Sequence, residues 1–315
     1  MLRETNLGTM VNLETDNENR FLYLFIAFDA SIQGFNYCRP VVSIDATHLK
    51  GKYQGALFTN DASWVWFLRR LKENFGEIPD HVIVSDRHLS INRVVMKVFP
   101  NAFHGLCIHH LLNDLKSKFK SKTKELEEHY YQTAKVYSVE EFNVLFYSLC
   151  SAVPGAKNYL EDVGLDKWTR SHSPSRKYNV MTTNILESMN AVLVKVRELP
   201  ITAFVNEIRL LCQNWFYERR KKEKDCTRKL STDVEKKLEI RRDQAQVMAV
   251  SSYDLCSPYY SKDYWYELYK GVVHPLPHIT QWSIPEHISA FKIMIPDVRT
   301  TIGRRKKRRI LLVGL

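Results

Sequence analysis

Two short apolar stretches, each leading to a single aspartate, constrain this chain more than any other feature. In residues 41–51, two valines and an isoleucine lead to Asp45. In residues 81–87, β-branched residues lead to Asp86. We interpret both stretches as short buried strands that carry the aspartate at their carboxyl ends. If these strands are neighbours in a sheet, the two carboxylates form an oxygen-lined site that suits magnesium or manganese.

The composition favours a folded protein with a polyanionic partner. Hydrophobic residues make up 44% of the 315 residues, which is too many for a disordered chain. The formal net charge of +11 suits a partner such as nucleic acid. A basic protein without such a partner is the alternative that this charge balance leaves open.

The six cysteines are dispersed along the chain and include no CxxC pair. We therefore interpret them as reduced thiols of an intracellular protein rather than as a disulfide framework. The N-terminus lacks the apolar core of a signal peptide, and no apolar run is long enough to cross a bilayer. We expect no membrane contact.

The segment between the two aspartates predicts a hairpin followed by a helix. Residues 51–59 are typical of the return strand of a hairpin. A helix follows, capped by Asn60 or Asp61, and Gly76 ends it. Its apolar face is formed by Trp64, Phe67, Leu68, Leu71 and Phe75.

The rest of the chain is mostly helical in pattern. Residues 21–28 read as a strand entering the core, whereas most of residues 91–180 show helical periodicity. A further helix at 203–221 has a predicted apolar face of Phe204, Ile208, Leu211 and Trp215. The stretch 219–242 is highly charged. Residues 253–298 are rich in tyrosine, tryptophan and proline, so we expect loops and short elements there.

Five ordered motifs resemble the Mutator-like (MULE) transposases and their domesticated plant relatives. The motifs are IDATHLKGKY at 44–53, DASWVWFLRRLK at 61–72, VIVSDRHLSI at 82–91, HGLCIHHLLNDLKSKF at 104–119 and MTTNILESMNAVL at 181–193. Shorter matches at 198–204, 215–220 and 257–277 extend the resemblance over most of the chain.

The resemblance implies an RNase H-like α/β core with a helical insertion between the second aspartate and a glutamate. Carried over position by position, the catalytic triad is Asp45, Asp86 and Glu187. These three carboxylates would hold Mg²⁺ or Mn²⁺ for DNA cleavage and strand transfer. Glu187 is also the capping-box partner of Asn184, and the two roles are compatible.

The family's CxxH element corresponds to Cys107 and His110. Two ligands do not complete a zinc site, so a buried thiol and a hydrogen-bonded histidine are the alternative. The basic run near the C-terminus predicts DNA contact and a nuclear location, although a solvated tail has the same composition. That run consists of Arg304, Arg305, Lys306, Lys307, Arg308 and Arg309.

The chain departs from the family pattern in three places. Asn60 runs straight into Asp61, where the family has a further stretch that includes a strand, so we expect the sheet to lack an edge strand. The SWIM zinc finger that the family carries near 240–256 lacks its CxC and CxH cysteines here, since Cys256 belongs to the segment that normally follows the finger, and we expect no bound zinc. The family's N-terminal DNA-binding region is also missing. A decayed element copy and a gene model that lost exons both explain these gaps.

We therefore expect an incomplete RNase H-like core with a large helical insertion and an irregular C-terminal tail. The predicted regions are a lead-in at 1–40, the transposase domain at 41–202 with its insertion at about 91–180, a helical and charged segment at 203–250, and a tail at 251–315. We expect DNA as the partner and the inherited strand-transfer activity to be impaired. The alternative hypothesis is a non-enzymatic DNA-binding or transcription-regulating protein, and the third hypothesis is a non-functional relic. The sequence leaves open whether the protein forms a homo-oligomer.

Overall fold

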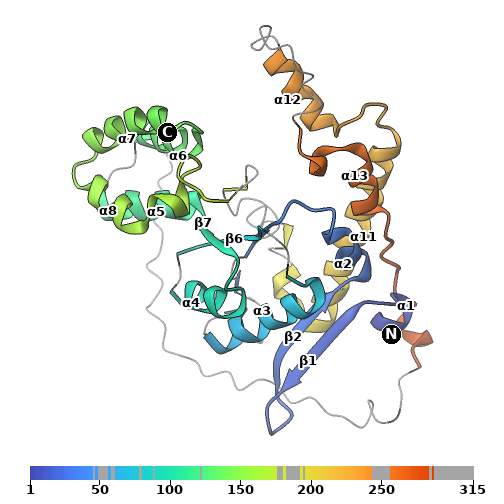
Figure 1. The fold of residues 1–315 in the computed structure, drawn as a ribbon. Coiled ribbons are helices and arrows are strands. Elements are labelled where there is room, and N and C mark those ends of the chain that lie inside the picture. Colours follow the sequence, from blue (N-terminus) through green and yellow to red (C-terminus); the bar gives the residue numbers. More distant parts are fainter. Residues whose placement is uncertain are drawn as a thin grey trace, which may run out of the picture.

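The computed structural model describes residues 1–44, 47–48, 56–57, 61–77, 80–87, 89–120, 123–175, 180–181, 192–193, 196–242, 256–283 and 286. Within them the chain is a mixed α/β fold of many helices and small sheets (Figure 1). Asp45, Glu187 and the basic run 304–309 lie outside the described residues. Their predicted roles therefore stay predictions.

The elements follow one another in the order that Figure 1 colours from blue to red. The strands are β1 (Met10–Thr15), β2 (Phe21–Ala27), β3 (Val41–Ser43), β4 (Thr47–His48), β5 (Ala56–Leu57), β6 (Val82–Ser85) and β7 (Phe103–Leu106). The helices are α1 (Leu2–Thr5), α2 (Asp29–Phe35), α3 (Asp61–Phe75), α4 (Leu89–Val98), α5 (Ile108–Phe119), α6 (Lys124–Lys135), α7 (Val139–Ala152), α8 (Ala156–Val163), α9 (Leu165–Trp168), α11 (Ile201–Lys224), α12 (Thr232–Arg242) and α13 (Lys262–Tyr269).

A three-stranded parallel sheet with the order β3-β6-β7 carries the strand before Asp86. The two strands predicted to lead to aspartates are β3 and β6, and they are neighbours with Val42 paired to Ile83. Every residue of β6 is buried. A central parallel strand has this property when both faces of its sheet are covered, because successive side chains point to opposite sides.

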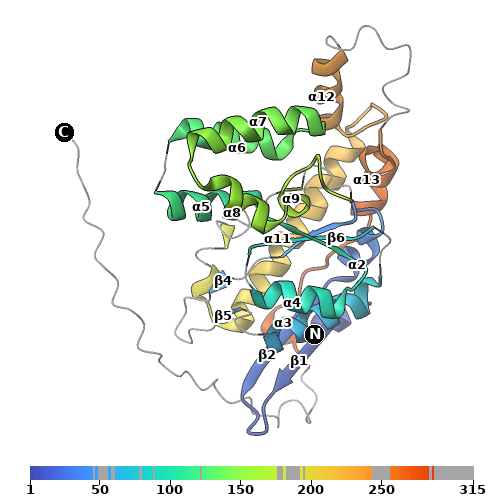
Figure 2. The same ribbon diagram turned by 60° about the vertical axis from the view of Figure 1, so that its left-hand side comes forward.

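The two faces of the sheet are covered by different parts of the chain. Ile83 packs in a cluster with α3 and α4, which also takes in Ile44 at the end of β3. Val82 and Val84 point the other way and pack with Cys107 at the start of α5. Helices α3 and α4 lie side by side in both views (Figures 1 and 2).

Helix α3 confirms the helix predicted after residue 60. Trp64 and Leu68, from the predicted apolar face, are 2% and 0% exposed. Gly76 ends the helix with a φ of 75°, and its amide donates to the carbonyl of Lys72. This left-handed conformation is open to glycine at little cost, which explains why the helix stops there.

Strand β7 is an element that the sequence reading missed. The stretch 91–180 was interpreted as a helical insertion, yet β7 lies within it and pairs in parallel with β6. The strand has only four residues, and His104 and Gly105 at its centre replace the β-branched residues that mark a strand. It belongs to the sheet, so the helical part of the insertion begins with α5.

Helices α5 to α9 form a group with its own core, which lies apart from α3 and α4 in Figures 1 and 2. Tyr130 and Trp168 stack at the centre of this core with ring centroids 5.4 Å apart. Two helices begin at hydroxyl caps, because Thr123 accepts from the amide of Leu126 and Ser138 accepts from that of Glu141. The helical pattern predicted for 125–170 is confirmed.

The two ends of the described chain pack together. Strand β2 confirms the strand predicted at 21–28 and pairs antiparallel with β1. Phe28 and Ala30 share a small core with Phe216 of α11 and Val273 of the tail. A side chain at Gly34 would come within 2.3 Å of the carbonyl oxygen of Leu268, so α2 and α13 are in close contact. The described part of the tail, residues 256–283, contains short elements, as predicted, and contributes Val273 and Tyr269 to this core.

Helix α11 differs from its prediction in the face that it buries. Ile208 of the predicted face enters the small core, whereas Cys212 and Phe216 enter it in place of the predicted Leu211 and Trp215. Trp215 is only half-buried and lies 5.5 Å from the Arg219 guanidinium as a cation–π pair. Tertiary contacts with the tail therefore rotate the buried face by about one residue.

All six cysteines are described, and none of them forms a disulfide. None of the helices in the described ranges combines the length and the apolar composition of a bilayer-crossing segment.

His81 provides a test of this core. It is 5% exposed, its ring packs edge-on against Phe99, and neither ring nitrogen has a hydrogen-bond partner among the described residues. Burial lowers the pKa of His81. The unfolded chain therefore binds a proton below about pH 6.5 that the folded chain resists, so stability falls as the pH drops through that value.

We predict that His81→Phe stabilises the fold by on the order of 1 kcal/mol at neutral pH and by more at acidic pH. Urea unfolding at both pH values measures this. The matched control is His278→Phe, at an exposed position. A loss of stability in His81→Phe at both pH values would contradict the prediction.

Candidate functional site

Asp86 lies at the carboxyl edge of the parallel sheet. It directly follows β6, whose last residue, Ser85, pairs with Leu106 of β7. The carbonyl of Ser85 accepts a hydrogen bond from the amide of Cys107 at 2.8 Å. The chain on either side of Asp86 is therefore fixed by the sheet, while the side chain itself is half-buried and reachable from solvent.

Three polar side chains form a network directly behind Asp86. The Ser85 hydroxyl lies 2.7 Å from the Asp86 carbonyl oxygen and 2.8 Å from Nε2 of His104. The other ring nitrogen of His104, Nδ1, lies 2.9 Å from Oδ1 of Asn92 on α4. A neutral imidazole with its proton on Nδ1 donates to Asn92 Oδ1, and its Nε2 accepts from the Ser85 hydroxyl. Because that hydroxyl has a single proton, its bond to Nε2 and its bond to the Asp86 carbonyl are alternatives. The network joins β6, β7 and α4 at the point where Asp86 leaves the sheet.

The electrostatics of this network keep His104 neutral. Burial, and to a lesser degree the Lys167 ammonium, lower the pKa of His104 to about 4, although the Asp86 carboxylate acts in the opposite direction. The carboxylate is therefore close enough to the imidazole to act on it. A histidine that stays neutral adds no positive charge beside the Asp86 carboxylate.

The described end of β3 reaches the same edge of the sheet. The amide of Ile44 donates to the carbonyl of Val84 at 2.9 Å, one residue before Ser85. Asp45 is the next residue in the sequence and lies outside the described residues. What the structure establishes is that β3 and β6 end side by side and point the same way.

The chain returns to this edge at Met181. Its carbonyl accepts a hydrogen bond from the amide of Ile108, the first residue of α5, at 2.9 Å. Met181 is 2% exposed and packs in the core of the α5–α9 group. Glu187, which follows six positions later in the sequence, lies outside the described residues.

Cys107 and His110, the predicted CxxH pair, lie at the start of α5. Cys107 is 1% exposed and packs against Val82 and Val84, which is the environment of a structural thiol. Among the described residues, no three His, Cys, Asp or Glu side chains gather closely enough to hold a metal ion. Asp45 and Glu187 of the predicted carboxylate triad lie outside the described residues, so this absence does not bear on the triad.

The basic run 219–224 is only partly a solvated face. Arg220 donates to the carbonyls of Lys270 and Gly271 at 3.2 and 2.9 Å. Glu223 is buried and pairs with Lys262 at 3.7 Å. Some charged side chains of this run therefore hold residues 262–271 against α11. The sequence pattern alone shows only a run of charges and does not reveal these contacts.

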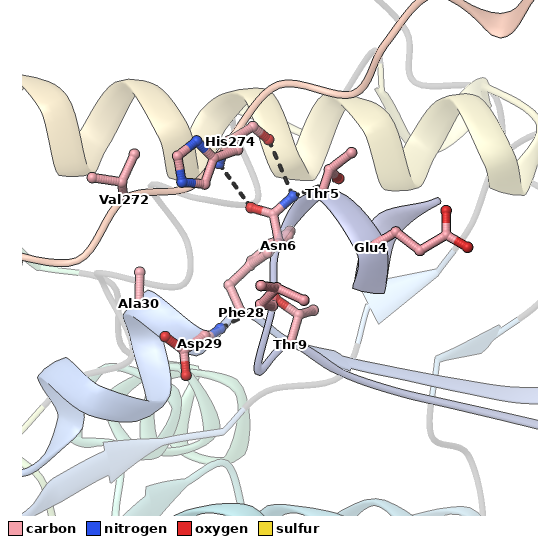
Figure 3. A pocket seen from close by; sticks show the side chains of 10 residues that line it. Glu4, Thr5, Asn6, Thr9, Phe28, Asp29, Ala30, Val272 and His274 are labelled. Atoms are coloured by element: carbon pink, nitrogen blue, oxygen red, sulfur yellow. Dashed lines mark hydrogen bonds between the residues drawn. The ribbon is translucent and has the colours of Figure 1, made fainter. Parts of the chain in front are cut away.

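A hollow of about 370 Å³ lies between the N-terminal segment and residues 272–274 (Figure 3). Asn6 spans it, because its amide donates to the His274 carbonyl and accepts from the His274 amide. Thr9 similarly accepts from the amide of Asp29. The Asn6 contacts join the N-terminal segment to residue 274, and the hollow takes in none of the predicted site residues.

Comparison with known proteins identifies one family. Residues 59–114 match the family model of the MULE transposase domain. The match spans α3, β6, α4, β7 and the first half of α5, and it includes Asp86, Cys107 and His110. It supports the interpretation of this chain as a member of the Mutator-like transposases. No curated protein matches the chain.

We predict that Ser85 and Asn92 are energetically coupled through His104. Ser85→Ala or Asn92→Ala alone leaves one ring nitrogen of His104 without its partner, at a cost of about 1–3 kcal/mol. The double variant should cost less than the sum by at least about 0.5 kcal/mol, because the second change acts on a network that is already broken. Urea unfolding of the four proteins measures the coupling. Additive costs would show that the network does not act as a unit.

Proposed function

We propose, starting from the chain's membership of the Mutator-like transposases, that this protein descends from an enzyme that cleaves and joins DNA strands with divalent metal ions. We assign Asp45, Asp86 and Glu187 as the carboxylates of that site. The proposed ion is Mg²⁺ or Mn²⁺, since oxygen ligands from carboxylates suit both.

The observation that carries the proposal is the parallel pairing of β3 with β6. Parallel strands end at the same edge of a sheet, and ligand sites of α/β sheets form outside the carboxyl ends of their strands. Asp86 follows β6, and Asp45 follows the last described residue of β3. This topology supports a site shared by the two aspartates and an RNase H-like reading of the core.

The contact between Met181 and Ile108 supports the third carboxylate. It brings the chain back to the start of α5, where Cys107 bonds to Ser85 beside Asp86. A short connection from Met181 can therefore reach the site with Glu187. A large helical group between the second and third carboxylates is compatible with one compact site, because both ends of that group are tied to the same edge.

The chain's own residues have two tasks in the proposed chemistry. The carboxylates bind and orient the ions, and the Ser85–His104–Asn92 network fixes the backbone from which Asp86 projects. When bound, the ions supply an activated water or 3′-hydroxyl and stabilise the leaving oxygen. We propose no zinc in this chain, in keeping with the missing finger cysteines.

We further propose that strand transfer is weak or absent in this form. Two-metal chemistry requires carboxylates held within about 0.5 Å of the productive geometry. In the described part of the chain, β3 pairs only with β6, while β4 and β5 pair with each other. An edge strand of three residues is a weak support for a ligand at its end.

We predict that the purified chain binds Mn²⁺ through Asp86 yet nicks supercoiled DNA slowly or not at all. Calorimetry should show tighter Mn²⁺ binding to the parent than to Asp86→Ala. Asp233→Ala, at an exposed position on α12, is the matched control for the loss of one carboxylate. Equal Mn²⁺ affinity in all three proteins would contradict the assigned site. Robust nicking that disappears in Asp86→Ala would support the site and overturn the proposed impairment.

A non-enzymatic DNA-binding or regulatory protein is the second candidate, favoured by the net charge of +11. For this function we propose a nuclear location and DNA contact by Arg304, Arg305, Lys306, Lys307, Arg308 and Arg309. Binding by charge is sequence-independent and weakens steeply with salt.

We predict that deletion of residues 303–315 lowers DNA affinity and makes its logarithm fall less steeply with the logarithm of salt concentration. Each lost phosphate contact should reduce that slope by about 0.9. Fluorescence anisotropy with two duplexes of unrelated sequence measures affinity and specificity together. An unchanged dependence of DNA affinity on salt concentration would show that residues 304–309 do not contact DNA.

A further inference from the structure

The residue after Asp86 joins the sheet edge to the helical group. Arg87 donates from its guanidinium to the Tyr159 hydroxyl at 2.7 Å, and its central carbon lies 5.2 Å from the ring centroid. Tyr159 lies on α8 and is 9% exposed, whereas Arg87 is exposed. The positive charge of Arg87 is thereby held at a fixed point one residue from Asp86.

A second cation meets the same ring from another helix. Lys118, near the end of α5, places its ammonium 4.4 Å from the Tyr159 centroid and 5.9 Å from that of Phe119. Phe119 also packs closely against the start of α8, because a Cβ added at Gly155 would lie 3.1 Å from the Phe119 ring. We refer to Arg87, Lys118 and Tyr159 together as the Tyr159 cluster.

The two cations of the cluster are not neutralised by the described part of the protein. Neither Arg87 nor Lys118 forms an ion pair with a described carboxylate. Asp114 acts electrostatically on Tyr159 but makes no ion pair with either cation. Two exposed cations ordered on one aromatic ring are pre-organised for an anion, because the contacts with the ring reduce the side-chain freedom that binding would remove.

We infer that the Tyr159 cluster binds a backbone phosphate of the DNA strand that enters the carboxylate site. This inference rests on the proposed function, since it names how the same site holds its substrate. Carboxylates repel a polyanion, so a strand that approaches Asp86 requires a positive contact nearby. Arg87 and Lys118 supply it from two elements, the loop after β6 and the end of α5, and the contact reads no base sequence.

The test is the salt dependence of DNA binding in Ca²⁺, under conditions without cleavage. The double variant Arg87→Ala/Lys118→Ala should weaken binding about fivefold to tenfold near 0.1 M salt and reduce the salt slope by about 0.9, the value for one phosphate contact, and each single variant should cause part of this loss. Arg87→Lys should keep most of the slope, because it retains the charge. The matched control is Lys237→Ala, an exposed lysine on α12, which should change binding by less than about twofold.

Tyr159→Phe separates binding from a purely structural role. It removes the hydroxyl that Arg87 contacts and keeps the ring beneath Lys118. Reduced DNA affinity with an unchanged melting temperature supports the inference. An unchanged slope in the double variant overturns it, as does an equal loss in Lys237→Ala.

The inference and the proposed function can fail separately. Mn²⁺ binding that depends on Asp86, together with unchanged DNA binding in the double variant, would overturn the inference alone. Reduced slopes without Mn²⁺ binding at Asp86 would support the phosphate contact and overturn the proposed metal site. Failure of the parent chain to bind DNA at any salt concentration would overturn both.

Discussion

The parallel hydrogen bonding of β6 to β3 and β7 is the constraint on which the candidate site depends. It fixes the direction of all three strands, so their carboxyl ends meet at one edge. Burial of β6 on both faces fixes its register. A shift by one residue would move Ile83 out of the cluster with α3 and α4 and put Val82 or Val84 in its place. The backbone of Asp86 therefore takes a defined position from this packing.

The helical group is joined to the sheet by a few specific contacts. The amide of Cys107 bonds to Ser85, that of Ile108 bonds to Met181, and Arg87 bonds to Tyr159. All three lie at the edge where Asp86 emerges. A group with its own core of stacked Tyr130 and Trp168 can therefore be long without displacing the site, because both of its ends return to the same place.

The sequence predicts this fold best where the signal is local. The apolar face and Gly76 stop of α3, the two strands before aspartates and the helices of 125–170 all follow from periodicity and capping. What it does not reveal depends on distant contacts. Four-residue β7 has no period of its own, and the buried face of α11 is chosen by the tail. In the candidate site, the place of Asp86 after a buried strand follows from the local pattern, whereas the partners of His104 and the pairing of Arg87 with Tyr159 join residues far apart in sequence.

The packing of α3 changes how the predicted loss of a strand should act. Loss of an edge strand would by itself expose apolar surface beside β3. The aromatic residues of α3 instead pack against the N-terminal segment. The ring centroids of Trp66 and Tyr23 lie 5.1 Å apart, and those of Phe75 and Phe35 of α2 lie 4.7 Å apart. The core around α3 is thus closed by other means. If the strand is absent, as we propose, its effect falls on the edge of β3 that no described strand pairs with, and not on the core around α3.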